Sequence, residues 1–329
     1  MAFVTSRPRA LVTAPLRGPG FAKLRQLADV IYDPWIDQRP LRIYTAEQLA
    51  ERVSAEGADI VVVESDSVKG PVFELGLRAI ASTRGDPNNV DVPGATAAGI
   101  PVLNTPARNA DAVAEMTVAL LLAATRRLLT ADADVRGGNM FRDGTIPYQR
   151  FRGWEIAGLT AGLVGLGAVG RATAWRLSGL GLRVIAHDPY NDKASHGLAE
   201  LLTEADVVSL HAPVTDETVG MIGTEQFAAM RDGVVFLNTA RAQLHDTDAL
   251  VEALRSGKVA AAGLDHFAGE WLPTDHPLTE MANVVLTPHI GGATWNTEAR
   301  QAQMVADDLA ALLSGGTPAH IVNPEVLGS

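Results

Sequence analysis

Two long stretches of the chain alternate short apolar runs with amphipathic, helix-like segments. In the first stretch the apolar runs are ALVTAP, DIVVVE, AIAST and IPVLN, at 10–15, 59–64, 79–83 and 100–104. Short apolar runs bounded by turn residues are typical of buried strands. Because helical patterns separate them, this stretch predicts parallel strands joined by crossover helices.

The second stretch repeats the pattern after a loop rich in Arg and Gly. Its apolar runs lie at 160–167, 182–188, 205–212, 233–239, 260–267 and 283–289. Six strands with intervening helices predict a doubly wound parallel sheet. A last helical pattern leads into a tail through HIVNP. The expected fold is therefore α/β, with two flavodoxin/Rossmann-like doubly wound parallel-sheet domains. If the tail rejoins the first domain, that domain is discontinuous, with the bounds 1–106 and 297–329, and the second domain spans 107–296.

The segment 109–138 between these stretches predicts one unusually long helix that ends at Gly-Gly. Such a helix either bridges two domains or packs against a second subunit; a long core helix within one domain is the alternative. Its apolar part, 117–124, is too short to span a bilayer.

Charge and composition exclude several classes of function. The formal net charge is −11, which disfavours a nucleic-acid partner, and the chain has no cysteine for disulfides or thiolate chemistry. The N-terminal MAFVTSRPRALVTAP lacks the uninterrupted apolar segment of a signal peptide. We therefore expect a cytoplasmic protein that binds neither membranes nor nucleic acids.

A glycine-rich turn follows the first predicted strand of the second domain. It reads Gly165-Leu166-Gly167-Ala168-Val169-Gly170, a GxGxxG between an apolar run and a helical one. That order suits a dinucleotide: glycines permit the tight turn and close backbone approach, and the helix N-terminus favours a diphosphate. The next strand ends at Asp188, whose carboxylate would accept hydrogen bonds from the ribose hydroxyls of the cofactor and would repel a 2′-phosphate. With no arginine beside it in sequence, the cofactor is predicted to be NAD.

Polar residues follow three more strands of the second domain. Arg241 comes after FLNTA, Asp265 and Glu270 lie in GLDHFAGE, and His289 lies in TPHIGG. Strand ends of this kind converge on one crevice. Arg241 would clamp a substrate carboxylate, His289 would protonate a carbonyl oxygen during hydride transfer, and Glu270 would favour the charged form of His289. No His/Asp/Glu cluster shows the spacing of metal ligands, so no metal is expected.

With these motifs together, the chain resembles the NAD-dependent D-2-hydroxyacid dehydrogenase family, close to its phosphoglycerate-dehydrogenase-like branch. The resemblance also rests on NVDVPGATAAGIPVLNTP, SLHAPVTDET, LNTAR and TPHIGGAT. It implies that Arg241, Glu270 and His289 are catalytic, that Asp265 contacts the nicotinamide, and that the long-helix region 109–138 builds a homodimer. It further implies a split substrate (catalytic) domain at 1–106 and 297–329 and an NAD-binding Rossmann domain at 107–296. The implied cofactor contacts come from Gly165, Gly167, Ala168, Val169, Gly170, Asp188, Pro213, Thr218, Thr239 and Gly292.

The substrate side departs from the phosphoglycerate dehydrogenase pattern. The glycine-rich loop of those enzymes is replaced by STRGDPNNVD, which places Arg84, Gly85 and Asp86 at the expected carboxylate site. Glu64 stands where relatives usually carry a phosphate-binding arginine, and an acidic side chain there should repel a phosphate dianion. Arginines of the loop after the long helix, at 142, 150 and 152, offer possible compensation. The expected substrate is an unphosphorylated 2-hydroxy or 2-keto acid, so Glu64→Arg should favour phosphorylated acids.

Three other functions remain open at this stage. One is 3-phosphoglycerate dehydrogenase. A second is formate dehydrogenase, disfavoured because those enzymes carry Gln where Glu270 stands. The third is a dinucleotide-sensing corepressor-like protein, which the complete set of Arg241, Glu270 and His289 disfavours.

Overall fold

The computed structural model describes residues 7–328 in two compact units. One unit runs to Arg108 and resumes at Thr294, and the other spans Asn109–Ala293. Each unit is described by itself below. The N-terminal stretch that lacks a signal-peptide pattern lies partly outside the described residues. Among the described helices, none is long and apolar enough to cross a membrane.

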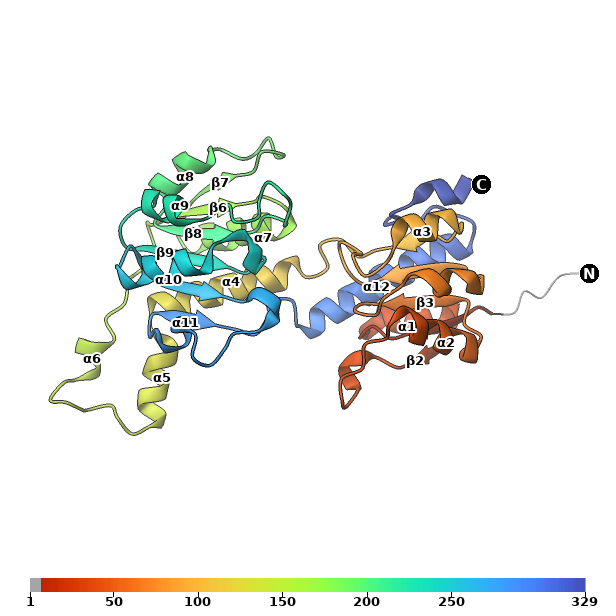
Figure 1. Cartoon of the computed structure of the whole chain (residues 1–329), viewed down its shortest axis with the longest axis horizontal. Helices are drawn as coiled ribbons and strands as arrows, with labels where there is room; N and C mark the ends of the chain where they lie inside the picture. Colours follow the sequence, from red (N-terminus) through yellow and green to blue (C-terminus); the bar gives the residue numbers. More distant parts are fainter. Residues whose placement is uncertain (1–6, 329) are drawn as a thin grey trace, which may run out of the picture. The chain divides into compact units, whose positions relative to one another are not determined.

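The first unit is built on a five-stranded parallel sheet with the order β2-β1-β3-β4-β5 (Figure 1). The four predicted strands are present as β1 (Arg9–Val12), β3 (Ile60–Val63), β4 (Ala79–Ser82) and β5 (Val102–Leu103). Sequence reasoning missed β2 (Asp29–Tyr32), an edge strand that pairs only with β1 and is half-buried, so its apolar signal is weak.

Helices cover this sheet, and the last long helix of the chain is one of them. They are α1 (Gly18–Leu27), α2 (Ala46–Glu56), α3 (Val92–Ala97) and α12 (Trp295–Leu313). Three 3₁₀ turns accompany them, at Trp35–Asp37, Gly70–Leu75 and Pro324–Gly328. α1 and α12 pack closely, because a Cβ on Gly20 would lie 2.2 Å from the Gln303 nitrogen. Ala302, Val305 and Leu309 of α12 are buried in the same core as β1.

The second unit holds a six-stranded parallel sheet with the order β11-β10-β9-β8-β6-β7. All six predicted strands are present: β6 (Thr160–Val164), β7 (Arg183–His187), β8 (Val207–Leu210), β9 (Val234–Asn238), β10 (Val259–Leu264) and β11 (Val284–Leu286). The prediction of two doubly wound parallel sheets is confirmed.

The helices of this unit follow its strands. They are α4 (Ala110–Thr125), α5 (Leu128–Arg136), α6 (Pro147–Arg150), α7 (Ala168–Gly179), α8 (Leu198–Glu204), α9 (Thr224–Ala229), α10 (Thr247–Arg255) and α11 (Pro277–Glu280). Short 3₁₀ turns lie at Ala242–Leu244 and Ala268–Glu270.

The prediction of one long helix over 109–138 is wrong. The helix ends at Thr125, Arg127 adopts a left-handed backbone with φ +52°, and α5 then starts in a new direction. The cause lies in the returning chain, because Trp154 donates its N–H to the Thr125 carbonyl at 3.1 Å. A continuing helix would need that carbonyl for its own next turn. Gly153 permits the approach, since a Cβ there would lie 2.3 Å from the same oxygen.

Residues 126–153 form an arm on the second unit, made of α5, α6 and their connecting loop. Figure 1 shows this arm extending away from the rest of the unit. Arg150 holds the arm together through Asp134, at 3.0 Å, and through the carbonyls of Asn139 and Met140. Arg142 also pairs with Asp134. Two of the three arginines proposed as phosphate ligands are thus engaged within the arm itself.

Candidate active site

The strand order of the second sheet reverses at β6: β7 is added on one side of β6, and β8 to β11 are added on the other. The turn after β6 begins at Gly165, whose φ of +102° disfavours any side chain. A Cβ there would also lie 2.6 Å from the Ala212 nitrogen, in the loop after β8. The two loops therefore touch at the switch point of the sheet, where open α/β sheets bind ligands.

The glycine loop fits a diphosphate. Gly170 is required sterically, because its Cβ would lie 2.1 Å from the Gly165 carbonyl oxygen. Gly167 is different: no atom of the described residues lies within 4 Å of its Cβ position, so the space beside it is open. Gly167 caps α7 without a side-chain hydrogen bond, which leaves the first-turn N–H groups of Ala168 and Val169 for an anion.

Asp188 is fixed beside this loop. One carboxylate oxygen accepts the Leu166 N–H at 2.7 Å and the other accepts the Tyr190 N–H at 3.0 Å. Each oxygen keeps a lone pair for a ribose hydroxyl. The fold also brings in an arginine that the linear reasoning overlooked, since Arg171 donates to the Leu166 carbonyl at 2.9 Å.

The other implied cofactor residues lie in loops that follow strands of the second sheet. Thr218 donates to the Pro213 carbonyl at 2.7 Å and closes the turn after β8. Thr239 follows β9, is buried, and shares a 2.8 Å hydrogen bond with Thr117 of α4. A Cβ on Gly292 would lie 2.9 Å from the Asn109 amide. Their cofactor contacts remain predictions.

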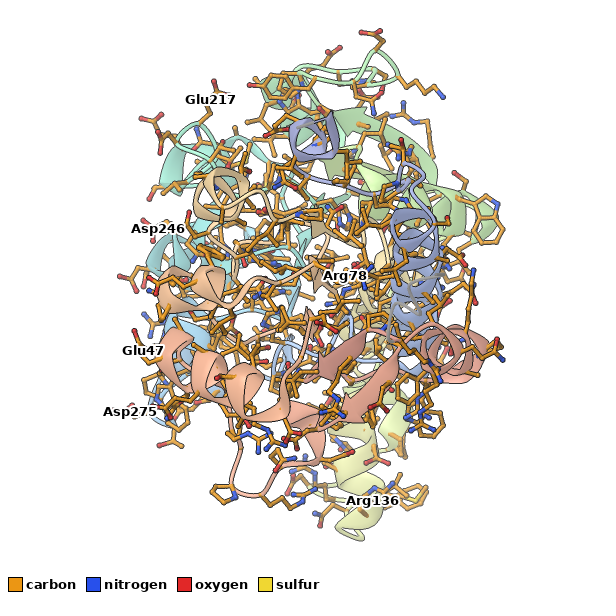
Figure 2. All side chains as sticks on the ribbon, turned by 90° about the vertical axis from the view of Figure 1, so that its right-hand side faces the viewer. Glu47, Arg78, Arg136, Glu217, Asp246 and Asp275 are labelled. Carbon is orange, nitrogen blue, oxygen red and sulfur yellow. The ribbon has the colours of Figure 1, made fainter. Side chains whose placement is uncertain are left out.

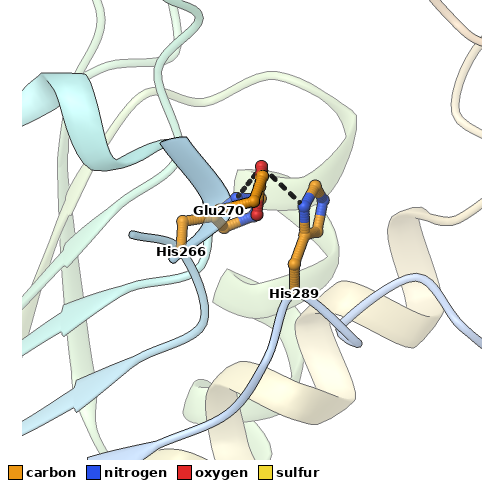
Figure 3. A group of neighbouring side chains, drawn as sticks. All are labelled: His266, Glu270 and His289. Carbon is orange, nitrogen blue, oxygen red and sulfur yellow. Dashed lines mark ion pairs between the residues drawn. The ribbon is translucent and has the colours of Figure 1, made fainter. Parts of the chain in front are cut away.

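His289 and Glu270 form an ion pair. Nδ1 of His289 lies 2.9 Å from Oε1 of Glu270, and both side chains are about half-exposed, at 43% and 58%. Figure 3 shows the two side chains reaching toward each other from the segments after β10 and β11. Both residues have a left-handed backbone, with φ +54° for His289 and +57° for Glu270. Non-glycine residues in this region cost free energy and cluster at functional sites.

Asp265 holds the His289 loop in that conformation. Its buried carboxylate accepts hydrogen bonds from the Thr287 hydroxyl at 2.6 Å, the Ile290 N–H at 2.9 Å and the Gly291 N–H at 2.7 Å. These donors flank His289 on both sides. The geometry therefore makes Asp265 a positioning residue for His289, and the implied nicotinamide contact stays a prediction.

His266 is the neighbour that motif reasoning undervalued. Its ring lies against His289, with centroids 3.8 Å apart and an interplanar angle of 51° (Figure 3). Burial, together with the nearby charges of His289 and Arg241, lowers the pKa of His266 to about 3. His266, Glu270 and His289 thus form a cluster that linear spacing did not reveal, because β11 lies between two of its members in sequence.

Arg241 lies in the loop after β9, close enough to influence His266 electrostatically. Asn238 shapes this loop: its amide donates to the Arg241 carbonyl at 2.8 Å and its oxygen accepts the Ala240 N–H at 2.9 Å. The Arg241 side chain is exposed and donates to the Ala240 carbonyl at 2.6 Å. Asn238, which sequence reasoning did not select, therefore positions the predicted carboxylate clamp.

The predicted substrate loop belongs to the first unit. Arg84 is half-buried, whereas Gly85 and Asp86 are exposed. The Asn104 amide donates to the Gly85 carbonyl at 2.6 Å, and the Thr105 N–H donates to the Arg84 carbonyl at 2.9 Å. Asn104 and Thr105, which follow β5, therefore hold the loop at the carboxyl end of β4, and its contacts with a substrate remain predictions.

Glu64 requires a correction. The sequence predicts that its negative charge repels a phosphate dianion, yet its Oε1 pairs with Nη2 of Arg108 at 2.5 Å, with both side chains largely buried. Arg108 also binds Gln301 of α12. The pair is neutral overall, so repulsion of a phosphate by Glu64 alone is not a sound argument. Glu64→Arg would instead place two guanidinium groups together.

Taken together, a doubly wound sheet, a glycine loop at a helix N-terminus and a His–Glu pair at the strand ends define a nucleotide-dependent oxidoreductase. Comparison with known families agrees. Residues 118–291 match the model described as "D-isomer specific 2-hydroxyacid dehydrogenase, NAD binding domain". The chain belongs to the D-isomer specific 2-hydroxyacid dehydrogenase family.

Individual relatives support the assignment along nearly the whole chain. A glyoxylate reductase of Thermofilum pendens is 38% identical over 98% of this chain and 96% of its own length. A D-3-phosphoglycerate dehydrogenase of Archaeoglobus fulgidus is 37% identical, over 80% of this chain and 51% of its own length.

Solved structures agree. The TT0316 protein of Thermus thermophilus has a TM-score of 0.82 and 38% identity, covering 95% of this chain and 99% of its own. An NADPH-dependent glyoxylate/hydroxypyruvate reductase of Sinorhizobium meliloti, in complex with NADP and malonate, has a TM-score of 0.74 and 27% identity, covering 97% and 98%. The protein is an NAD(P)-binding D-2-hydroxyacid dehydrogenase.

Proposed function

We propose that this enzyme reduces a small unphosphorylated 2-keto acid, with glyoxylate as the first candidate, to the corresponding 2-hydroxy acid, using NADH. A keto acid with a prochiral carbonyl would give the D product. The 2.9 Å pair between His289 and Glu270 carries this proposal, because it places a proton donor and its carboxylate partner at the strand ends of a nucleotide-binding sheet.

Each polar group at this site has a distinct task in the proposed reaction. NADH, when bound, supplies the hydride for the carbonyl carbon. Arg241 binds the substrate carboxylate with its exposed guanidinium. His289, as imidazolium, donates a proton to the carbonyl oxygen, while Glu270 stabilises the positive charge and Asp265 holds the loop. In the oxidative direction His289 accepts the proton.

The preference for NADH over NADPH rests on Asp188. A carboxylate at the end of β7 accepts ribose hydroxyls and repels a 2′-phosphate. Arg171, the arginine near this loop, donates to the Leu166 carbonyl at 2.9 Å. We therefore expect NADH to be preferred, even though a family member of similar fold uses NADPH.

The unphosphorylated substrate is favoured by the pattern of relatives. The glyoxylate reductase aligns over nearly its entire length, whereas the phosphoglycerate dehydrogenase aligns over about half of its own. The neutral Glu64–Arg108 pair offers a phosphate no net positive charge. We place the carboxylate-binding loop at Arg84, Gly85 and Asp86, and assign the first unit to the substrate and the second to the cofactor.

A panel of keto acids tests this function. Glyoxylate, hydroxypyruvate, pyruvate and 3-phosphohydroxypyruvate are each assayed for kcat/KM, with NADH and with NADPH. We expect the highest value for an unphosphorylated acid with NADH. A preference for the phosphorylated acid would restore the 3-phosphoglycerate dehydrogenase alternative. If NADH bound measurably but was not oxidised with any acid, the alternative of a dinucleotide-sensing corepressor-like protein would be favoured.

We also propose that the chain forms a homodimer through α4, α5 and the arm. Large apolar side chains are exposed there, namely Leu128, Leu129, Val135, Met140, Phe141, Ile146 and Tyr148. A separate, mainly apolar hollow lies between α4 and α7, and Trp175 and Leu180 are exposed in its lining. Exposed apolar surface of this extent favours association. Figure 2 shows Arg136 at the solvent-facing end of α5.

Sedimentation equilibrium tests the dimer. Phe141→Asp should place an unpaired charge in the interface and shift the equilibrium toward monomer. The matched control is Trp271→Asp, because Trp271 is equally exposed (71% against 74%) and lies outside the arm. A monomeric wild type, or equal effects of the two variants, would exclude this interface.

A further inference from the structure

Three atoms that can bind a transition metal converge after β10 and β11. One imidazole nitrogen each of His266 and His289 and one carboxylate oxygen of Glu270 all lie within 4.8 Å of one another. Oε1 of Glu270 is 2.9 Å from His289 and 4.0 Å from His266. Figure 3 shows the carboxylate between the two imidazole rings. Ligands on a tetrahedral zinc lie about 3.3 Å apart, given bonds of about 2.0–2.1 Å, so the two distances from Oε1 of Glu270 bracket the required separation.

His266 provides an independent sign of a ligand. Its side chain is only 4% exposed, yet Nδ1 has no hydrogen-bond partner among the described residues. The ring is hydrogen-bonded to the Thr239 backbone, which leaves Nδ1 directed at the carboxylate of Glu270. A buried imidazole nitrogen without a donor is costly. Its lone pair suits a cation placed between it and the carboxylate.

The composition of the cluster selects the kind of cation. Two imidazole nitrogens and one carboxylate oxygen are a ligand set of zinc enzymes, in which the fourth position stays open. Magnesium and calcium prefer oxygen ligands and higher coordination numbers. Glu270 and His289 are about half-exposed, so a cation can reach the cluster and keep a water in the fourth position.

We propose that His266, Glu270 and His289 form a binding site for Zn²⁺, and that occupation of this site reversibly inhibits the dehydrogenase. The inhibition rests on the proposed function, in which His289 is the proton donor. A nitrogen that gives its lone pair to a metal cannot hold a proton, so zinc at Nδ1 excludes the imidazolium form. Glu270 is then a ligand of the metal and no longer a partner of a charged ring. Zinc binding itself does not depend on the proposed function, because it requires only that the three ligand atoms are correctly placed.

Binding and inhibition are measured separately. Zinc affinity is determined by competition with a chromogenic zinc indicator on the cofactor-free enzyme, and inhibition from the rate of NADH oxidation with glyoxylate at rising Zn²⁺. We expect one tight zinc per chain, inhibition over the same concentration range, and reversal by EDTA. Mg²⁺ at the same concentrations should leave the rate unchanged.

Two variants isolate the site. His266→Phe keeps an aromatic ring against His289 but removes the ligand nitrogen, so zinc affinity should fall roughly tenfold or more. Its sensitivity to zinc is expressed relative to its own zinc-free rate. Glu270→Gln is followed by zinc binding alone and should weaken it similarly. The matched control is His196→Gln, which removes a histidine 3.2 Å from Glu204, a pair without the third ligand. It should leave affinity and inhibition unchanged.

The outcomes separate the two proposals. Equal zinc affinity in the wild type and in both His266→Phe and Glu270→Gln would overturn the site. Zinc binding that depends on His266 but leaves the rate unaffected would support the site and contradict the role of His289 in the proposed function. Circular dichroism confirms that each variant is folded before its affinity is interpreted.

Discussion

The two sheets of this enzyme have the same strand order at their centre. They differ in whether the polar side chains at their strand ends are bonded within the unit or exposed. In the first unit the ends of β1 and β3 carry Thr13, Glu64 and Asp66, and these are bonded within the unit: Asp66 accepts from the Thr13 hydroxyl at 2.5 Å, and Glu64 pairs with Arg108. In the second unit the ends of β9, β10 and β11 present Arg241, Glu270 and His289 with substantial exposure.

This difference shows that polar residues after parallel strands are not by themselves a sign of catalysis. Both sheets have them, because strand ends are where the chain leaves the apolar core. Chemistry requires that the group also face solvent or ligand. Strained backbone adds a second criterion: Glu270 and His289 both have positive φ, whereas Glu64 and Asp66 do not.

The largest expected effect comes from removing the exposed proton donor. His289→Gln should lower kcat for keto-acid reduction by about 10²–10⁴-fold, because the amide cannot donate the proton as an imidazolium does. Stopped-flow measurement of NADH oxidation checks this.

The matched change in the first unit is Glu64→Gln, which leaves Arg108 with a neutral partner. It should lower the melting temperature and leave kcat nearly unchanged, because the pair is largely buried within the first unit. If the two variants showed the same pattern, the contrast between the strand ends of the two units would not hold.

The next effect concerns the glycine loop. Gly167→Ala meets no atom of the described chain, so the fold should tolerate it, yet a methyl group there would occupy the space proposed for the diphosphate. We expect the Kd for NADH to rise at least about tenfold with an unchanged melting temperature. Gly179→Ala is the control, because Gly179 lies on the same helix and its Cβ position is equally open. Fluorescence titration with NADH would refute the loop assignment if both variants bound like wild type.

A smaller shift is expected for cofactor choice. Asp188→Ser should reduce the ratio of kcat/KM for NADH to that for NADPH by about tenfold, by removing the charge that repels a 2′-phosphate. Asp192→Asn, an exposed carboxylate nearby in sequence, should leave the ratio as it is. An unchanged ratio in Asp188→Ser would remove this residue from cofactor selection.

The smallest effect is on acid stability, and it should fall on the second unit. Burial lowers the pKa of His211 and of His245 to about 4. Between that value and the unfolded pKa of about 6.5, the unfolded state binds more protons than the folded state. The free energy of unfolding should therefore fall as pH drops from 6.5 toward 4, by about 1–3 kcal/mol for each histidine.

Urea denaturation at pH 7, 6 and 5 measures this loss. His245→Asn keeps an acceptor near Asn238. This variant should lose less free energy of unfolding between pH 7 and 5 than the wild type, by the contribution of one histidine. His196→Gln should not, because His196 is only partly buried and lies beside Glu204, at 3.2 Å, in the same unit. A pH dependence that stays the same in His245→Asn would mean that this histidine is not neutral in the folded protein.

Sequence reasoning was most successful where the signal is local. Ten of the strands follow from short apolar runs, and the glycine loop follows from its place between a strand and a helix. It failed where a distant contact decides. Trp154 and Gly153, which lie 29 and 28 residues beyond Thr125, end α4, and Arg108 neutralises Glu64 from 44 residues away. β2 was missed because an edge strand buries little of its surface.

The candidate site shows the same limit. The pairing of Glu270 with His289 followed from motifs and is observed at 2.9 Å. The stacking of His266 on His289 required the register of β10 and β11, in which Leu264 lies opposite Leu286. The sequence offers no local sign of this register. Sequence reasoning therefore could not show that His266, two positions after the end of β10, lies against His289.

The hydrogen bond from Trp154 to Thr125 closes the arm at its base, so that both ends of the excursion meet at one peptide group. A segment closed in this way can be lengthened, shortened or exchanged without altering the path from α4 into β6. The arm is therefore a module: evolution or an engineer can replace residues 126–153, and with them the surface proposed for the dimer, while leaving the strand ends of the second sheet in place.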